Sequence, residues 1–228
     1  MVSVLNIVVL ATLAAFANGD TDYCKLESCQ GPNHTLCKYA FLKTDDSQCG
    51  QIKSSTLTDE EIQEILDNHN QMRAYVASGQ ETRGSNGPQP AAMNLGPLEW
   101  DDEIAGIAQT LADQCHYGHD ACRDVERFPV GQNIAFAGST ADWDSSWSDI
   151  MQQWYNEVDK FDGTLVSSVP ASGFDGTAHY TQLMWADTKY VGCGGIRYNA
   201  DGEWYKTYLV CNYGPAGNYV GMAMYEVA

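Results

Sequence analysis

Apolar residues recur at helical spacing after a capping box formed by Thr58 to Glu61. In such a box the threonine hydroxyl and the glutamate carboxylate each accept a hydrogen bond from a backbone N–H group of the first turn. The apolar face of the helix that follows is expected to hold Ile62, Ile65, Leu66, His69, Met72 and Val76. Because His69 lies on this face, we interpret it as a hydrogen-bonded core histidine rather than a metal ligand.

Two further segments carry the helical period. A second helix is expected to begin at Asp101 or Asp102 and to have Cys115 at its end. Its inward-facing residues are expected to be Ile104, Ile107, Ala108 and Leu111. A third helix is expected from Trp147 to Val158, and its apolar face holds Ile150, Met151, Trp154 and Val158.

Between and after these segments the pattern favours strands. Residues Val130 to Ala137, Val191 to Tyr198 and Tyr205 to Asn212 have strand-like composition, and Asp201-Gly202 supplies a hairpin turn between the last two. The segment Tyr180 to Trp185 fits either period. Helices interspersed with antiparallel hairpins predict a mixed α and β domain.

The N-terminal segment has the pattern of a secretory signal peptide. Residues Val2 to Phe16 are almost wholly apolar and uncharged, and Ala17-Asn-Gly19 places small residues at the cleavage position. The run is short for a membrane span, which needs roughly 18 to 20 apolar residues. We therefore expect a signal peptide over residues 1–19, Asp20 as the first residue of the secreted chain, and an extracellular location.

Eight cysteines in an exported chain imply four disulfides rather than thiol chemistry. Eight cysteines can pair in about 105 ways, so their spacing alone leaves the connectivity open. Residues 20–55 carry four of them, show little periodicity, and are expected to form an irregular extension that disulfides fasten to the rest. This extension also contains the sequon Asn33-His-Thr35, which predicts N-glycosylation at Asn33.

The charge balance limits the kinds of partner. The chain has 30 Asp plus Glu against 12 Lys plus Arg, a formal net charge of −18. Such a surface repels phosphate backbones and anionic headgroups. Nucleic acid, heparin-like polymers and anionic membranes are therefore poor partners.

Two polar and aromatic segments near the C-terminus carry a family resemblance: His179-Tyr-Thr-Gln-Leu-Met-Trp185 and Cys211-Asn-Tyr-Gly-Pro-Ala-Gly-Asn218. They resemble the two signatures of the CAP superfamily, which includes cysteine-rich secretory proteins, antigen-five venom proteins and plant pathogenesis-related-one proteins. Ala178 departs from the pattern, because the family usually has glycine or a charged residue there. The segments Tyr23-Cys-Lys25, Gly87-Pro-Gln-Pro90 and Cys115-His-Tyr-Gly-His-Asp120 resemble the antigen-five branch in particular.

The resemblance implies an α+β fold, the three-layer α-β-α sandwich of CAP proteins, over residues 56–228. It implies the disulfides Cys24–Cys37, Cys29–Cys122, Cys49–Cys115 and Cys193–Cys211. It also implies a monomeric, secreted venom protein of the allergen type. Its partners would be host extracellular proteins or small lipids.

CAP domains place two histidines and two acidic residues at a central cleft. Matched position by position, His119, Glu157 and His179 fill three of these places, and Gln132 stands where most of the superfamily has glutamate. Two neutral imidazoles can hold a divalent cation. Because Gln132 adds no charge, we expect no required cofactor and only weak zinc binding through His119 and His179.

Catalysis is not expected. The sequence has no Gly-x-Ser-x-Gly elbow, HExxH helix or glycine-rich phosphate loop, and every cysteine is assigned to a disulfide. The primary hypothesis is a non-enzymatic protein that binds host molecules, and a metal-dependent hydrolase using Glu157 is an alternative. A second alternative is a scavenger of lipids, sterols or eicosanoids with Tyr155, Phe161 and Phe174 beside the cleft. The competing interpretation is that these side chains simply fill the core under a long loop.

Overall fold

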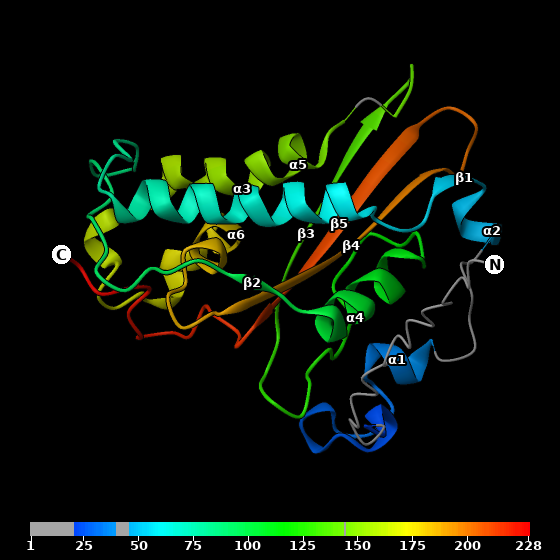
Figure 1. Cartoon of the computed structure of the whole chain (residues 1–228), viewed down its shortest axis with the longest axis horizontal. Helices are drawn as coiled ribbons and strands as arrows, with labels where there is room; N and C mark the ends of the chain where they lie inside the picture. The colour runs from blue at the N-terminus through cyan, green and yellow to red at the C-terminus, as the bar shows by residue number, and fades with distance from the viewer. Residues whose placement is uncertain (1–20, 40–45, 144) are drawn as a thin grey trace, which may run out of the picture.

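A twisted sheet occupies the centre of the molecule in the computed structural model, which describes residues 21–39, 46–143 and 145–228 (Figure 1). Within these residues the strands run in the order β1-β4-β5-β3, and the short β2 pairs in parallel with β4. Their bounds are β1 Gln51–Ser54, β2 Glu99–Trp100, β3 Gly131–Ser139, β4 Tyr190–Asn199 and β5 Tyr205–Gly214. The three strands expected from the sequence are confirmed, and the signal peptide and Asp20 lie outside the described residues.

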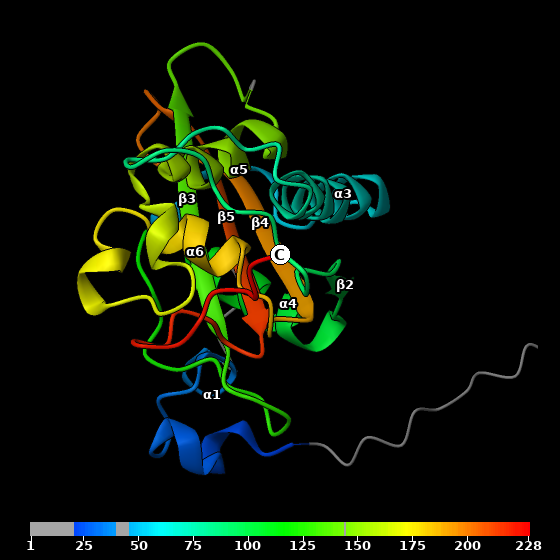
Figure 2. The same ribbon diagram turned by 90° about the vertical axis from the view of Figure 1, so that its left-hand side faces the viewer.

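Helices cover both faces of this sheet, as Figures 1 and 2 show from two directions. On one side lie α3 (Asp59–Ala77), α5 (Trp147–Tyr155) and α6 (Ala178–Leu183), and on the other lies α4 (Asp102–Ala112). The short helices are η1 Tyr23–Lys25, η2 Glu27–Cys29, α1 Thr35–Lys38, α2 Asp46–Cys49, η3 Asn156–Lys160, η4 Gly163–Leu165 and η5 Ala171–Phe174. The α+β three-layer arrangement is therefore confirmed.

Close contact between α4 and the sheet depends on glycines of β4. A Cβ atom on Gly194 would lie 2.2 Å from the backbone N and Cα of Gln109, and one on Gly192 would lie 2.4 Å from the backbone N of Ala105. Real Cβ atoms do not approach other atoms so closely, so any side chain here would push the helix away. The helix backbone thus rests directly on the strand.

Helix ends follow the sequence signals with two differences: α4 ends at Ala112, before the expected Cys115, and the third helix is shorter than expected. Thr58 and Glu61 form the expected capping box, and Asp101 caps α4 by accepting a hydrogen bond from the backbone of Ile104. The third helix was expected to reach Val158, but its α-helical part ends at Tyr155 and continues as the 3₁₀ helix η3. Tightening of this kind is common at helix C-termini, where carbonyl groups lose their i+4 partners.

The N-terminal extension is more regular than its composition predicts. It contains four short helices and the strand β1, which pairs with β4 in an antiparallel register. The cysteines pair as Cys24–Cys37, Cys29–Cys122, Cys49–Cys115 and Cys193–Cys211, the connectivity that the resemblance implies. Two of these bridges fasten the extension to the region after α4. In the described part of the chain, no helix has the length and apolarity needed to cross a membrane.

The prediction for His69 is confirmed, because the imidazole lies fully buried in the core. Its Nδ1 is 2.8 Å from the carbonyl oxygen of Ile65, and its Nε2 is 2.9 Å from the hydroxyl of Tyr213. Since a carbonyl can only accept, Nδ1 donates to Ile65 and Nε2 accepts from Tyr213. This neutral imidazole therefore joins α3 to β5.

Acid should weaken the fold through His69. Burial lowers its pKa from 6.5 to about 4, so the unfolded chain binds a proton here before the folded protein does. This contribution to stability is complete above pH 6.5 and falls between pH 6.5 and 4, by about 3 kcal/mol in total. Denaturant unfolding at several pH values, compared with His69→Gln, measures it. An unchanged pH slope in the variant would contradict the assignment.

Candidate functional site

Four residues predicted for the cleft form two hydrogen-bonded pairs. His179 lies in the first turn of α6 and pairs with Glu157 of η3. His119 lies in the loop after α4 and pairs with Gln132 at the start of β3. Both histidine side chains are reached by solvent, His119 more than His179.

Glu157 is held by three hydrogen bonds. One carboxylate oxygen is 2.7 Å from Nδ1 of His179, and the other accepts from the backbone N–H groups of His179 and Tyr180, at 2.9 and 3.1 Å. A carboxylate at a helix N-terminus satisfies free N–H groups and interacts favourably with the helix dipole. Glu157 therefore caps α6 and orients His179.

The ring of His179 is fixed from a second direction by an indole. The imidazole stacks on Trp154 of α5, with ring centroids 6.1 Å apart and planes inclined by 20°. Since Nδ1 is taken by Glu157, the remaining ring nitrogen, Nε2, is the atom that can face a ligand. The geometry suits a metal ligand whose second nitrogen is hydrogen-bonded to a carboxylate.

Gln132 orients His119 and is itself held in place by a second side-chain amide, that of Asn212. Its Oε1 is 2.7 Å from Nδ1 of His119, and its Nε2 donates to Oδ1 of Asn212 at 3.0 Å. The amide of Asn212 in turn donates to the carbonyl of Ile104 in α4. These hydrogen bonds fix the amide oxygen of Gln132 toward His119, so Nδ1 of His119 donates and its Nε2 keeps a lone pair.

The two pairs meet along β3 without forming a compact metal site. Asn133, next to Gln132, donates to the carbonyl of His179 at 3.1 Å. Among the described residues, one group of three His, Cys, Asp or Glu side chains has its ligand atoms within 4.8 Å of one another: Cys29, Cys122 and Asp124. Cys29 and Cys122 share a disulfide, so neither offers the thiolate that a metal would require.

The side chains proposed for lipid contact lie mostly in the core. Tyr155 and Phe161 are buried, and Phe174 is half-buried against the same core cluster. The Tyr155 hydroxyl donates to Glu81 at 2.7 Å. Tyr155 also lines a groove of about 290 Å³, together with Asn68, Gln71, Met72, Tyr75 and Gln152.

Sequence reasoning missed this groove between α3 and α5. Tyr75 could have indicated the groove, because it lies on the solvent side of the amphipathic helix α3 and its large side chain is 44% exposed. Met72 was placed on the apolar face of α3, and it lies only partly buried against the core. The sequence could not show that the two helices leave space between these residues.

Replacing Glu157 separates its two roles. In Glu157→Gln a single amide oxygen replaces the two carboxylate oxygens that now accept from three N–H groups. We therefore expect the free energy of unfolding to fall by about 1 kcal/mol. In Glu157→Ala all three bonds are lost, and we expect a loss of about 2 to 3 kcal/mol. Thermal and denaturant unfolding measure both variants. Equal, negligible losses would mean that the carboxylate does not cap α6.

The comparisons with known proteins agree with this fold. Residues 66–213 match the family described as "CAP: Cysteine-rich secretory protein family". The chain is 47% identical over 222 residues to "Venom allergen 5" of Rhynchium brunneum, covering 97% of this chain and 96% of that protein. It is 49% identical over 210 residues to "Venom allergen 3 homolog" of Dinoponera quadriceps, covering 91% and 90%.

Solved structures show the same architecture. "Structure of BmVAL-1" aligns with a TM-score of 0.66 at 23% identity, covering 78% of this chain and 87% of that one. "Crystal structure of NaASP2 with Zn2+" aligns with a TM-score of 0.63 at 28% identity, covering 77% and 90%. The chain therefore belongs to the cysteine-rich secretory protein (CAP) family. Within that family it is a secreted protein of the venom-allergen type, similar to the allergens named 5 and 3.

Proposed function

We propose that this protein acts outside the cell by binding host molecules, without catalysis. The observation that supports this proposal most strongly is that the cleft holds one carboxylate and not two, and that this carboxylate caps α6. Gln132 is uncharged, and Glu157 already accepts three hydrogen bonds. A hydrolase would have to use the free ring nitrogen of His119 or His179 as its general base, without a free carboxylate to assist it. CAP venom allergens are also generally not enzymes, which agrees with this proposal.

An assay for hydrolysis tests the absence of catalysis. We expect turnover of peptide and ester substrates, with zinc or with chelator, to equal that of a His119→Ala, His179→Ala double variant. Turnover that zinc supports and the double variant lacks would establish the hydrolase alternative instead. The proposed partners are host extracellular proteins met by a monomer secreted from a venom or salivary gland.

Weak zinc binding at the cleft is part of the proposal. NaASP2, a relative by structure, was solved with Zn²⁺. In this chain His119 and His179 each keep one ring nitrogen available, because the other nitrogen is hydrogen-bonded. Two protein ligands fall short of the three or four of tight zinc sites, so the affinity should be micromolar or weaker. Bound zinc would supply a Lewis acid there, held by these two imidazoles.

Calorimetric titration with zinc tests the cleft assignment. We expect His179→Ala to abolish the binding and Gln132→Glu to strengthen it by adding a negative charge beside the cation. Binding should weaken in acid, because both imidazoles must be neutral to coordinate. His116→Ala is the matched control, since His116 is exposed and close to His119 in the chain. If His179→Ala binds as well as the unmodified protein, the ion binds elsewhere.

A lipid scavenger is the second candidate, favoured by the groove between α3 and α5. Its volume of about 290 Å³ lies at the lower limit for small-molecule sites, roughly 300 to 1,000 Å³, which suits one acyl chain better than a sterol. A fluorescent fatty acid should bind to Met72→Asp much more weakly than to the unmodified protein. Met93→Asp, at an exposed methionine outside the groove, is the control.

A further inference from the structure

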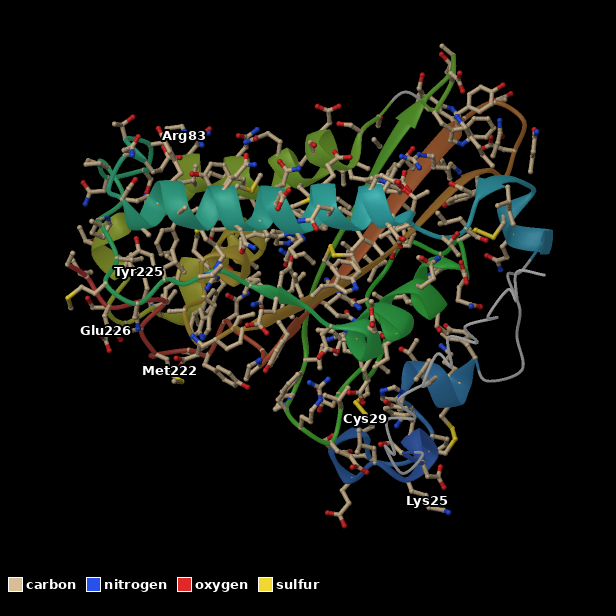
Figure 3. All side chains as sticks on the ribbon, viewed as in Figure 1. Lys25, Cys29, Arg83, Met222, Tyr225 and Glu226 are labelled. Carbon is tan, nitrogen blue, oxygen red and sulfur yellow. A yellow bond between two sulfur atoms is a disulfide. The ribbon has the colours of Figure 1, made fainter. Side chains whose placement is uncertain are left out.

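A cavity lies between the N-terminal extension and the loop that follows Cys122. It shares no lining residue with the groove between α3 and α5, and none of the four cleft residues lines it. Its volume is about 610 Å³, within the range of small-molecule sites. Residues of 22–28 line it from the extension, and residues of 124–129 line it from the loop. Figure 3 labels Lys25 and Cys29 at this end of the molecule.

The two walls of this cavity are fastened to each other. The disulfide Cys29–Cys122 joins them covalently. His34 contributes a hydrogen bond from Nε2 to the carbonyl of Asp124 at 3.0 Å, and the backbone N–H of Thr35 donates to the carbonyl of Cys122 at 2.9 Å. A cavity with linked walls is formed before any partner arrives, which lowers the entropy cost of binding.

The charges that line the cavity are unbalanced. Its two cations already have partners: Lys25 pairs with Asp22 at 2.7 Å, and Arg127 pairs with Asp101 and Glu103, which do not line the cavity. Three lining carboxylates take part in no ion pair within the described residues: Glu27, Asp124 and Glu126.

Apolar side chains lie between these carboxylates. They are Leu26, Val125, Phe128 and Pro129, and of these only Val125 is fully buried. Phe128 is held in place by stacking on Tyr190, with ring centroids 5.8 Å apart. A surface that combines apolar contact with unpaired negative charge complements a partner that combines apolar contact with positive charge.

We infer that this cavity docks an extended basic segment of a host protein, one in which arginine or lysine alternates with apolar side chains. The segment's cations would lie beside Glu27, Asp124 and Glu126, and its apolar side chains would cover Leu26 and Phe128. The inference rests on the proposed binding function and names its partner by chemistry. It uses none of the cleft residues.

Fluorescence anisotropy with two labelled hexapeptides tests this inference on the protein secreted from insect cells. One peptide alternates arginine with leucine, and the other has serine in place of each leucine, so both carry the same charge. We expect the leucine peptide to bind about tenfold more tightly, because its side chains reach the apolar lining. The double variant Glu27→Gln, Glu126→Gln should bind it about three- to tenfold more weakly.

The control is Asp187→Asn with Glu203→Gln, the same loss of charge at exposed positions outside the cavity. Unchanged melting temperatures establish that both double variants are folded. Equal affinity for the two peptides, or equal weakening in the two variants, would assign binding to the overall negative charge and overturn the inference. Absence of peptide binding would overturn the inference as well. So would displacement of the peptide by millimolar Ca²⁺ but not by Na⁺ of equal ionic strength, because the carboxylates would then form a cation site. None of these results alters the zinc titration at the cleft, so the two proposals fail separately.

Discussion

Arg73→Met is expected to lower the free energy of unfolding by about 5 kcal/mol, because it leaves several buried carbonyl groups without a donor. Arg73 lies on α3 and is 1% exposed. Its guanidinium donates to the carbonyl oxygens of Gly96, Leu183, Trp185 and Thr188 at 2.7 to 3.5 Å. Two of these carbonyls lie at the C-terminal end of α6, where the helix dipole favours a cation.

Burial lowers the pKa of Arg73 to about 10, so the group remains charged at neutral pH. Denaturant unfolding measures the loss. Arg127→Met is the matched control, since Arg127 is 43% exposed and its ion pairs should contribute at most about 1 kcal/mol. Similar losses in both variants would show that the four carbonyls find other donors when Arg73 is absent.

Trp185→Ala is expected to cost about 4 kcal/mol, within the range for truncating a buried tryptophan. The Trp185 side chain is 1% exposed, and it belongs to the large core cluster between the sheet and α5. Removing the indole leaves a cavity that the surrounding core cannot fully close.

Trp204→Ala removes an equal volume from a side chain that is 47% exposed, so it serves as the comparison. Its loss should stay below about 1 kcal/mol, because little core contact is removed. Glu157→Gln should likewise cost far less than Trp185→Ala. If Trp185→Ala and Glu157→Gln were equally destabilising, the signature tryptophan would not be a core residue.

Local patterns predicted most of the fold. The capping box at Thr58, the apolar faces of α3 and α4, and the hairpin at Asp201-Gly202 each depend on neighbouring residues, and all three are present. What the patterns missed depends on distant contacts. β2 is short and pairs with β4 across about ninety residues, and β1 becomes a strand only because β4 offers it an edge.

The sequence predicts which residues belong to the candidate site, but it does not predict how they pair or that Glu157 caps a helix. His119, Gln132, Glu157 and His179 were identified from the resemblance, and the structure joins them as two pairs. The function of Glu157 as a cap could not be foreseen, because it requires the start of α6 to meet η3. The same limit applies to Arg73, whose carbonyl partners lie up to 115 positions away in the chain.

The glycines of β4 restrict where this protein can change during evolution. Since the backbone of α4 rests on Gly192 and Gly194, those two positions should accept almost no substitution. Exposed loops carry no such restriction. Sequence divergence between related secreted proteins should therefore accumulate in the loops, which form the surface that an antibody meets. Antibodies raised against one member would then recognise another to the extent that these loops have stayed alike, however well the central layers are preserved.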